Sequence, residues 1–178
     1  FIPKCLVPIY ELPGIKRLIR QCKAHGVSKI FISISADHFT LLESALSRHS
    51  FGDVQVKCVN EEKPLGTIAG LLSFKDVVGA ESCLIVLGDE YYSDTNPFES
   101  INQSGKLGTQ TDMFVGVVRN SPPNRIECVV THDSSMKLLS MKDKPTQNER
   151  AGSLTRWACF VGLGPGIFSL AVASPNKS

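Results

Sequence analysis

The sequence contains no long hydrophobic run and no excess of charge of one sign. Hydrophobic residues make up 42% of its 178 residues, but they are broken into short runs. None of these runs approaches the ~20 apolar residues that a membrane-spanning helix needs. The 19 Lys and Arg residues are balanced by 17 Asp and Glu residues, which gives a formal net charge of +2. We therefore expect a soluble protein that binds neither membranes nor nucleic acid, since nucleic-acid-binding domains carry a strongly basic surface.

The six cysteines follow no metal-binding or redox motif. No Cys-x-x-Cys pair is present, and the His residues complete no zinc pattern. Four cysteines lie in apolar periodic segments, where cysteine behaves as a small hydrophobic residue: Cys22, Cys58, Cys83 and Cys159. We predict buried free thiols and hence a reducing, cytoplasmic location.

The first half of the sequence alternates between helical and strand-like patterns. Apolar residues at helical spacing predict helices over 13–25, 37–49 and 67–75. Short apolar runs predict buried strands over 29–35, 54–59 and 83–87. This β-α-β-α-β order predicts a three-layer α/β/α, Rossmann-like domain in which these three strands run parallel.

Hairpin signals dominate the second half. Strands are predicted over 113–119, 126–132, 137–141 and 157–163, with short helices over 96–101 and near Phe168. The sequence Asp133-Ser134-Ser135 predicts a hairpin turn. No linker or repeat divides the chain, so we predict one domain with a mixed sheet, whose hairpin-rich half covers the carboxyl ends of the parallel strands.

Two segments of the first half carry the pattern of a nucleotide site. The strand predicted over 83–87 ends at Gly88-Asp89, and in open α/β sheets ligands bind at the carboxyl ends of the strands. The segment Pro64-Leu65-Gly66-Thr67 lies between a strand and a helix. Thr67 can cap that helix, and Gly66 allows backbone N–H groups to approach an anionic or flat ligand. Asp89 is therefore the first candidate for a chemical role.

Four blocks of sequence resemble the sugar-phosphate nucleotidylyltransferases, in matching order over nearly the whole chain. The blocks are Pro3-Lys4-Cys5-Leu6-Val7-Pro8 with Pro13-Gly14-Ile15, then Pro64 to Gly70 with the strand ending at Gly88-Asp89, then Asp143-Lys144-Pro145, and finally residues 157–168. The resemblance implies a GT-A-like nucleotidyltransferase fold with a sugar-binding second half. It also implies an enzyme that transfers a nucleotidyl group from a nucleoside triphosphate to a sugar 1-phosphate and releases pyrophosphate.

The resemblance implies roles for individual residues. Asp89 would bind Mg²⁺, Lys4 would contact the triphosphate, and Lys144 would contact the phosphate of the sugar. Catalysis would depend on neutralising and aligning phosphates rather than on a covalent nucleophile. The residues implied to bind the nucleotide are Glu61, Leu65, Gly66, Thr67 and Gly88, with Gly66 and its neighbours packed against the base and the Glu61 segment at its edge.

The sequence also departs from the family pattern. It lacks the Gly-x-Gly-x-Arg phosphate loop and the central strand before it, so we expect the domain of residues 1–178 to be incomplete at both ends. A Tyr-Gly pair of the family is replaced by Ile126-Glu127, and Cys159 stands where relatives often have glycine. These departures leave two alternatives open: a catalytically silent regulatory or scaffold subunit, and a related module with a choline-like or lipid-linked substrate. The sequence leaves the oligomeric state open, a homo-oligomer included.

Overall fold

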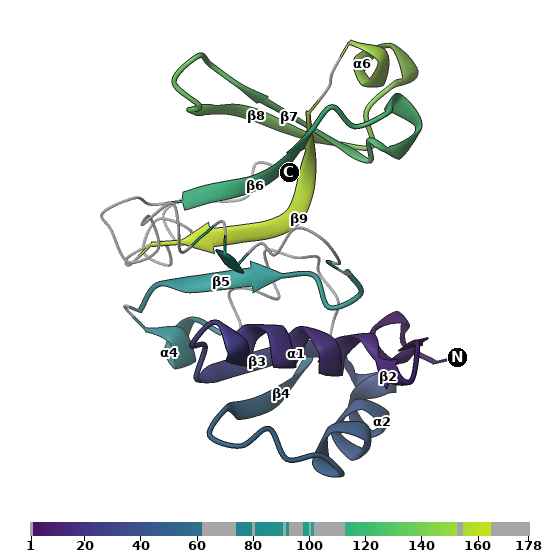
Figure 1. Cartoon of the computed structure of the whole chain (residues 1–178), viewed down its shortest axis with the longest axis vertical. Coiled ribbons are helices and arrows are strands. Elements are labelled where there is room, and N and C mark those ends of the chain that lie inside the picture. The colour runs from purple at the N-terminus through teal and green to yellow at the C-terminus, as the bar shows by residue number, and fades with distance from the viewer. Residues whose placement is uncertain are drawn as a thin grey trace.

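A computed structural model describes residues 2–61, 74–79, 81–90, 92, 98–99, 101, 113–152 and 155–164, with the backbone alone for Cys159 and Phe160. Figure 1 shows the chain rising from the N-terminal helices and strands to the hairpins of the second half. The first half contains η1 (Lys4–Leu6), β1 (Pro8–Ile9), β2 (Leu12–Pro13), α1 (Gly14–Ala24), β3 (Lys29–Ser35), α2 (Ala36–Ser47), β4 (Gln55–Glu61), α4 (Lys75–Val78) and β5 (Cys83–Val86). Among the described helices, none has the length and apolarity needed to cross a membrane.

Strands β3 and β4 form the parallel pair that the sequence predicts. Their register runs from Lys29 opposite Gln55 to Ser35 opposite Glu61. Helix α2 connects the two strands and packs on both, as parallel strands need a crossover connection. The predicted helix and strand alternation of this region is confirmed.

Strand β5 was expected to be the third parallel strand, but it is paired in another sheet. It forms an antiparallel ladder with β9 (Thr155–Leu163), from Cys83 opposite Leu163 to Val86 opposite Phe160. The described parallel ladder therefore contains β3 and β4 only. The hydrophobic pattern of a strand identifies a buried strand, but it does not identify the neighbour that satisfies its backbone groups.

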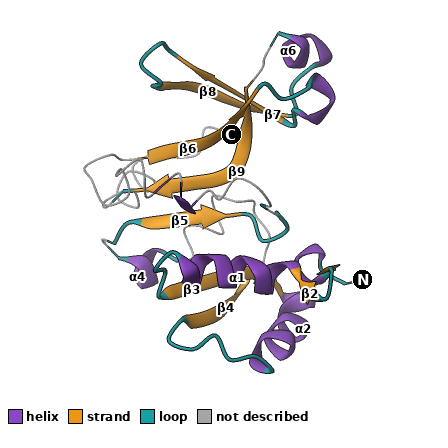
Figure 2. Ribbon diagram, viewed as in Figure 1, coloured by secondary structure: helices purple, strands orange, loops and turns teal. Residues whose placement is uncertain are grey.

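The second half is built from antiparallel strands, as the hairpin signals predict (Figure 2). Its remaining elements are β6 (Met113–Arg119), η2 (Pro123–Arg125), β7 (Cys128–His132), β8 (Leu138–Asp143) and α6 (Gln147–Ala151). The long strand β9 pairs with β5 and β6, and its Arg156 pairs with Val129 of β7. The chain thus has the mixed α/β architecture that was predicted.

Helix α1 joins the β3–β4 pair and the sheet that contains β5 through one hydrophobic core. Its predicted apolar face is buried, with Ile15, Leu18, Ile19 and Cys22 each at most 9% exposed. The described members of β3 and β5 that pack against this core are Ile30, Ile32, Ile34, Leu84 and Val86. In Figure 1, α1 accordingly lies across the region between β3 and β5. This packing fixes the N-terminal segment against the carboxyl end of β5.

Candidate active site

The structure places Lys4 and Asp89 side by side. The Lys4 ammonium lies 3.6 Å from Oδ2 of Asp89, and the two side chains are 87% and 41% exposed. Lys4 begins η1, a turn closed by the bond from the Leu6 amide to the Pro3 carbonyl at 2.9 Å. Asp89 follows β5 through Leu87 and Gly88. Two residues predicted separately, 85 positions apart in the sequence, therefore form one charged pair.

Close packing beneath the pair keeps η1 and β5 together. A Cβ atom at Gly88 would lie 3.6 Å from Cδ1 of Ile15 and 3.8 Å from Cβ of Cys5. The backbone at Gly88 thus rests against α1 and η1. Burial raises the pKa of the Cys5 thiol, and the nearby Asp89 carboxylate raises it further. These contacts hold the segment before Asp89 in place, while the Asp89 side chain stays 41% exposed.

The exposed Lys4–Asp89 pair contributes little to the stability of the fold. An exposed ion pair contributes about 0–1 kcal/mol to folding, so this pair does little to hold the fold together. A carboxylate oxygen is a hard ligand that suits Mg²⁺, which commonly takes one or two carboxylates together with phosphate oxygens and water. The described residues contain no group of three or more potential metal ligands. Asp89 can therefore offer a carboxylate oxygen to an ion of this kind.

Lys144 is positioned by the end of the β7–β8 hairpin. The last pair of the ladder joins Cys128 to Asp143, and the Lys144 amide then donates to the Glu127 carbonyl at 2.9 Å. The backbone of Lys144 is left-handed, with φ of 48°, which sharply redirects the chain after β8. The side chain is exposed. Within the described ranges, no ion pair joins Lys144 to Asp89.

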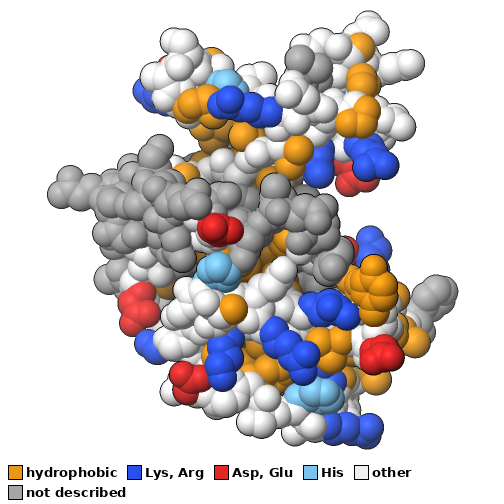
Figure 3. Space-filling view, in the orientation of Figure 1, with side chains coloured by type: hydrophobic (Ala, Val, Ile, Leu, Met, Phe, Trp, Pro, Cys, Tyr) orange, Lys and Arg blue, Asp and Glu red, His pale blue; other side chains and the backbone are white. Residues whose placement is uncertain are grey.

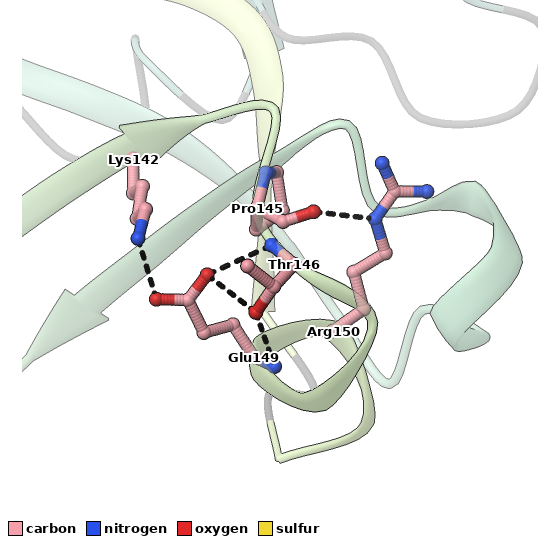
Figure 4. Close-up of polar contacts among 5 residues, drawn as sticks. All are labelled: Lys142, Pro145, Thr146, Glu149 and Arg150. Atoms are coloured by element: carbon pink, nitrogen blue, oxygen red, sulfur yellow. Dashed lines mark hydrogen bonds and ion pairs between the residues drawn. The ribbon is translucent and has the colours of Figure 1, made fainter.

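A capping box holds the chain immediately after Lys144 (Figure 4). The amide and hydroxyl of Thr146 donate to Oε2 of Glu149 at 2.8 and 2.9 Å, and the Glu149 amide donates back to Oγ1 of Thr146 at 3.4 Å. Lys142 binds the other carboxylate oxygen at 2.6 Å, and Nε of Arg150 donates to the Pro145 carbonyl at 3.1 Å. The hydrogen bond from Lys142 and those from Thr146 lower the pKa of Glu149 to about 2.

This capping box was absent from the sequence predictions, although the sequence contains its signature. Thr146 is followed three positions later by Glu149, the spacing of the Ser/Thr-x-x-Glu motif at a helix start. The motif shows that Lys144 lies on a fixed turn between β8 and α6, and its role in binding stays a prediction.

The remaining predicted residues lie in different parts of the chain. Glu61 ends β4, and its carboxylate accepts a hydrogen bond from the hydroxyl of Ser33. Ile126 is fully buried, so the replaced family pair places an apolar side chain in the core and Glu127 at the Lys144 turn. Predicted residues Leu65, Gly66 and Thr67 lie outside the described residues.

Figure 3 shows an indentation between the part with α6 and the part with the N-terminus, with charged side chains on both sides.

The five described cysteines are free thiols, as predicted, but only two of them are buried. Cys22 and Cys128 are buried, while Cys5, Cys58 and Cys83 are half-buried. Burial raises the pKa of Cys22 to about 11. These thiols therefore behave as packing residues within the described part of the chain.

Comparison with known proteins gives one consistent family. A sequence profile of the family described as nucleotidyl transferase matches residues 2–168. A UTP–glucose-1-phosphate uridylyltransferase of Mycoplasma pneumoniae is 26% identical over 94% of this chain and 66% of its own length. A mannose-1-phosphate guanylyltransferase regulatory subunit alpha of Dictyostelium discoideum is 28% identical over 81% of this chain and 36% of its own length. The chain thus spans less than two thirds of either relative.

A solved structure shows the same fold. The crystal structure of a putative glucose-1-phosphate thymidylyltransferase from Bacillus anthracis superimposes with a TM-score of 0.80 at 20% identity, covering 99% of this chain and 68% of that one. At this identity, the likeness concerns the fold.

Proposed function

The chain belongs to the nucleotidyl transferase family, and we propose that its protein transfers a nucleotidyl group from a nucleoside triphosphate to a sugar 1-phosphate. The observation that carries this proposal is the exposed pair of Lys4 and Asp89, 3.6 Å apart at the end of β5. A cation and a carboxylate on one small surface can bind a phosphate and the counter-ion of that phosphate together. This is the arrangement that a reaction between two phosphorylated substrates requires.

The proposed chemistry assigns a task to each described site residue. A phosphate oxygen of the sugar 1-phosphate attacks the α-phosphorus, and the bond from that phosphorus to the bridging oxygen of the leaving pyrophosphate breaks. Lys4 binds the triphosphate, and Lys144 binds the phosphate of the sugar as a mobile point charge. Asp89 would hold Mg²⁺, which would neutralise phosphate charge. The residues mainly align two anions that would otherwise repel each other.

A second candidate function is that of a regulatory subunit without turnover. The Dictyostelium discoideum relative is named as a regulatory subunit, and it matches this chain at 28% identity. The Ile126-Glu127 replacement next to the Lys144 turn is the feature of this chain that favours it. A subunit of this kind would bind nucleotide or sugar nucleotide without releasing pyrophosphate.

Two measurements on the full-length protein separate these functions. The first is a thermal-shift panel of nucleoside triphosphates with Mg²⁺, in which a ligand at 100 times its dissociation constant adds about 2.7 kcal/mol of stability. The second is pyrophosphate release with a panel of sugar 1-phosphates. If the protein is a transferase, a nucleoside triphosphate should stabilise it and pyrophosphate should be released. If it is a regulatory subunit, a nucleoside triphosphate should stabilise it without pyrophosphate release. A protein that shows neither effect, with any combination of nucleoside triphosphate and sugar 1-phosphate, would contradict both functions.

A Lys4→Gln variant tests whether the described site is responsible. Lys29 provides the matched control because it is also an exposed lysine paired with a carboxylate, Glu81, at 3.2 Å. Lys4→Gln should weaken nucleotide binding, and Lys29→Gln should leave it unchanged. Equal effects of the two substitutions would remove Lys4 from the site.

A further inference from the structure

Lys16 is a buried lysine outside the proposed active site. It lies on α1 and is only 6% exposed. Its ammonium contacts the ring of His49, with 2.9 Å to Nδ1 and 3.2 Å to Nε2. Since an ammonium can only donate, the ring nitrogen that bonds to it must accept. His49 is exposed, so this contact links the buried lysine to a residue at the protein surface.

Two arginines add positive charge to the same place. Arg20 follows Lys16 by four residues on α1, which places both on one side of the helix. Arg48 is the C-cap residue of α2 and directly precedes His49. Burial, followed by the charges of Arg48 and Arg20, lowers the pKa of Lys16. Figure 3 shows Lys, Arg and His side chains gathered over α1 and α2 in the lower half of the molecule.

No carboxylate forms an ion pair with Lys16, Arg20 or Arg48 in the part of the chain that the structure describes. The ion pairs found there involve Lys4, Lys23, Lys29 and Lys142. The C-terminus of α2 supplies the equivalent of about half a negative charge. This leaves most of the charge of Lys16, Arg20 and Arg48 uncompensated. The Lys16 ammonium is bonded to His49 and the two arginines are exposed, so an anion that binds here would meet an excess of positive charge.

We propose that Lys16, Arg20, Arg48 and His49 form a binding site for a phosphate dianion, either free or as the phosphoryl group of a small metabolite. Guanidinium groups match the paired oxygens of a phosphate, and the Lys16 ammonium supplies a fixed point charge beneath them. The charge of a phosphate monoester, about −1.5 to −2 at neutral pH, would offset most of the excess positive charge of the cluster. This site lies where α1 meets the end of α2 and is separate from the Lys4–Asp89 pair in its residues and contacts.

Calorimetric titration of the full-length protein with inorganic phosphate, at constant ionic strength, tests this site. Wild type should bind phosphate saturably. The Arg20→Gln/Arg48→Gln double variant should bind at least about tenfold more weakly, since both residues lose charged hydrogen bonds. Both arginines are exposed, so the double variant should fold normally. Lys16→Met, which keeps an unbranched side chain, should also weaken binding.

Lys23 provides the matched control. It lies on the same helix, but its ammonium is already paired with Asp53 at 3.0 Å. A Lys23→Gln/Lys29→Gln double variant removes the same number of charges from residues outside the cluster. Binding should remain within about twofold of wild type, allowing for long-range screening at physiological salt. An equal loss in this variant would show diffuse surface attraction and overturn the proposal.

Two further outcomes would overturn the proposed phosphate site. Absence of saturable phosphate binding to wild type would overturn the site. Loss of binding in Lys4→Gln but not in the double arginine variant would place the anion at the Lys4–Asp89 pair and would also overturn it. A parallel titration with glycerol 3-phosphate distinguishes a site for free phosphate from a site for the phosphoryl group of a metabolite. Binding of both ligands with the same dependence on Arg20 and Arg48 supports a phosphoryl group, and binding of phosphate alone supports the free ion.

Discussion

The capping box after Lys144 makes a sharp prediction about stability. Replacing Thr146 with alanine removes the hydroxyl that accepts from the Glu149 amide at 3.4 Å and donates to the Glu149 carboxylate at 2.9 Å. The Thr146 amide still donates to the carboxylate at 2.8 Å, and Lys142 still binds it. Half of the reciprocal cap is therefore retained.

The expected cost follows from this partial loss. Removing an N-cap side chain costs about 0.5–2 kcal/mol. The site is exposed, the amide bond to the hydroxyl is long, and two contacts of Glu149 survive. We therefore expect a loss of about 1 kcal/mol in the unfolding free energy. Because this cap fixes the turn that carries Lys144, the variant should also raise KM for the sugar 1-phosphate.

Urea denaturation of the full-length protein, followed by circular dichroism, measures this loss. Thr146→Ser is the matched control because it keeps the hydroxyl and loses only a methyl group. Serine should retain most of the stability that alanine loses. Equal destabilisation by serine and alanine would refute the hydrogen-bonding explanation and assign the effect to the methyl group.

Three further predictions concern ionisation and packing. The pKa of Glu149 in the folded protein is about 2, against an ordinary 4.5. Its contribution to stability is therefore present above pH 4.5 and is lost as pH falls toward 2. Between pH 5 and pH 3, the unfolding free energy of Glu149→Gln should fall less steeply than that of the wild type. Leu42 is 0% exposed, so Leu42→Ala should cost about 2–5 kcal/mol, whereas Leu41→Ala, at 46% exposed, should cost far less in the same denaturation assay. A Cβ atom at Gly162 would overlap the ring of Phe114, so Gly162→Ala should destabilise by about 1–3 kcal/mol and lose this effect in a Phe114→Ala background.

Local pattern predicted the individual elements well. The apolar face of α1 is buried as its spacing requires, and β6 has the predicted bounds, Met113–Arg119. The boundaries of α2 and β4 differ from prediction by one or two residues, because terminal turns depend on caps and on neighbouring strands. The pattern of apolar and polar residues in each of these segments therefore predicted whether it forms a helix or a strand.

Long-range pairing was outside the reach of local pattern. Strand β5 satisfies its backbone groups with β9, whose residues lie more than 70 positions away. The contact between Lys16 and His49 spans 33 positions and joins two surface-type residues with no shared motif. Both contacts depend on how complete helices and strands pack, which the periodicity of each segment does not encode.

The candidate site was predicted in part by resemblance. The resemblance of the sequence blocks to the family identified Lys4 and Asp89 as candidate site residues. The structure shows that they are adjacent. The roles implied for Leu65, Gly66 and Thr67 stay predictions, because these residues lie outside the described ranges. The fixed turn around Lys144 was missed, although the Thr146 to Glu149 spacing could have indicated it.

The most direct test of the central claim is the turnover of Asp89→Asn in the full-length protein across a Mg²⁺ titration. The control is Glu90→Gln, which removes the same charge from the next residue. Asp89→Asn should keep the fold and lose roughly 100-fold or more in kcat, because a neutral amide cannot replace a carboxylate at the metal. Glu90→Gln should retain most activity. Unchanged turnover of Asp89→Asn at every Mg²⁺ concentration would contradict the proposed role of the Lys4–Asp89 pair.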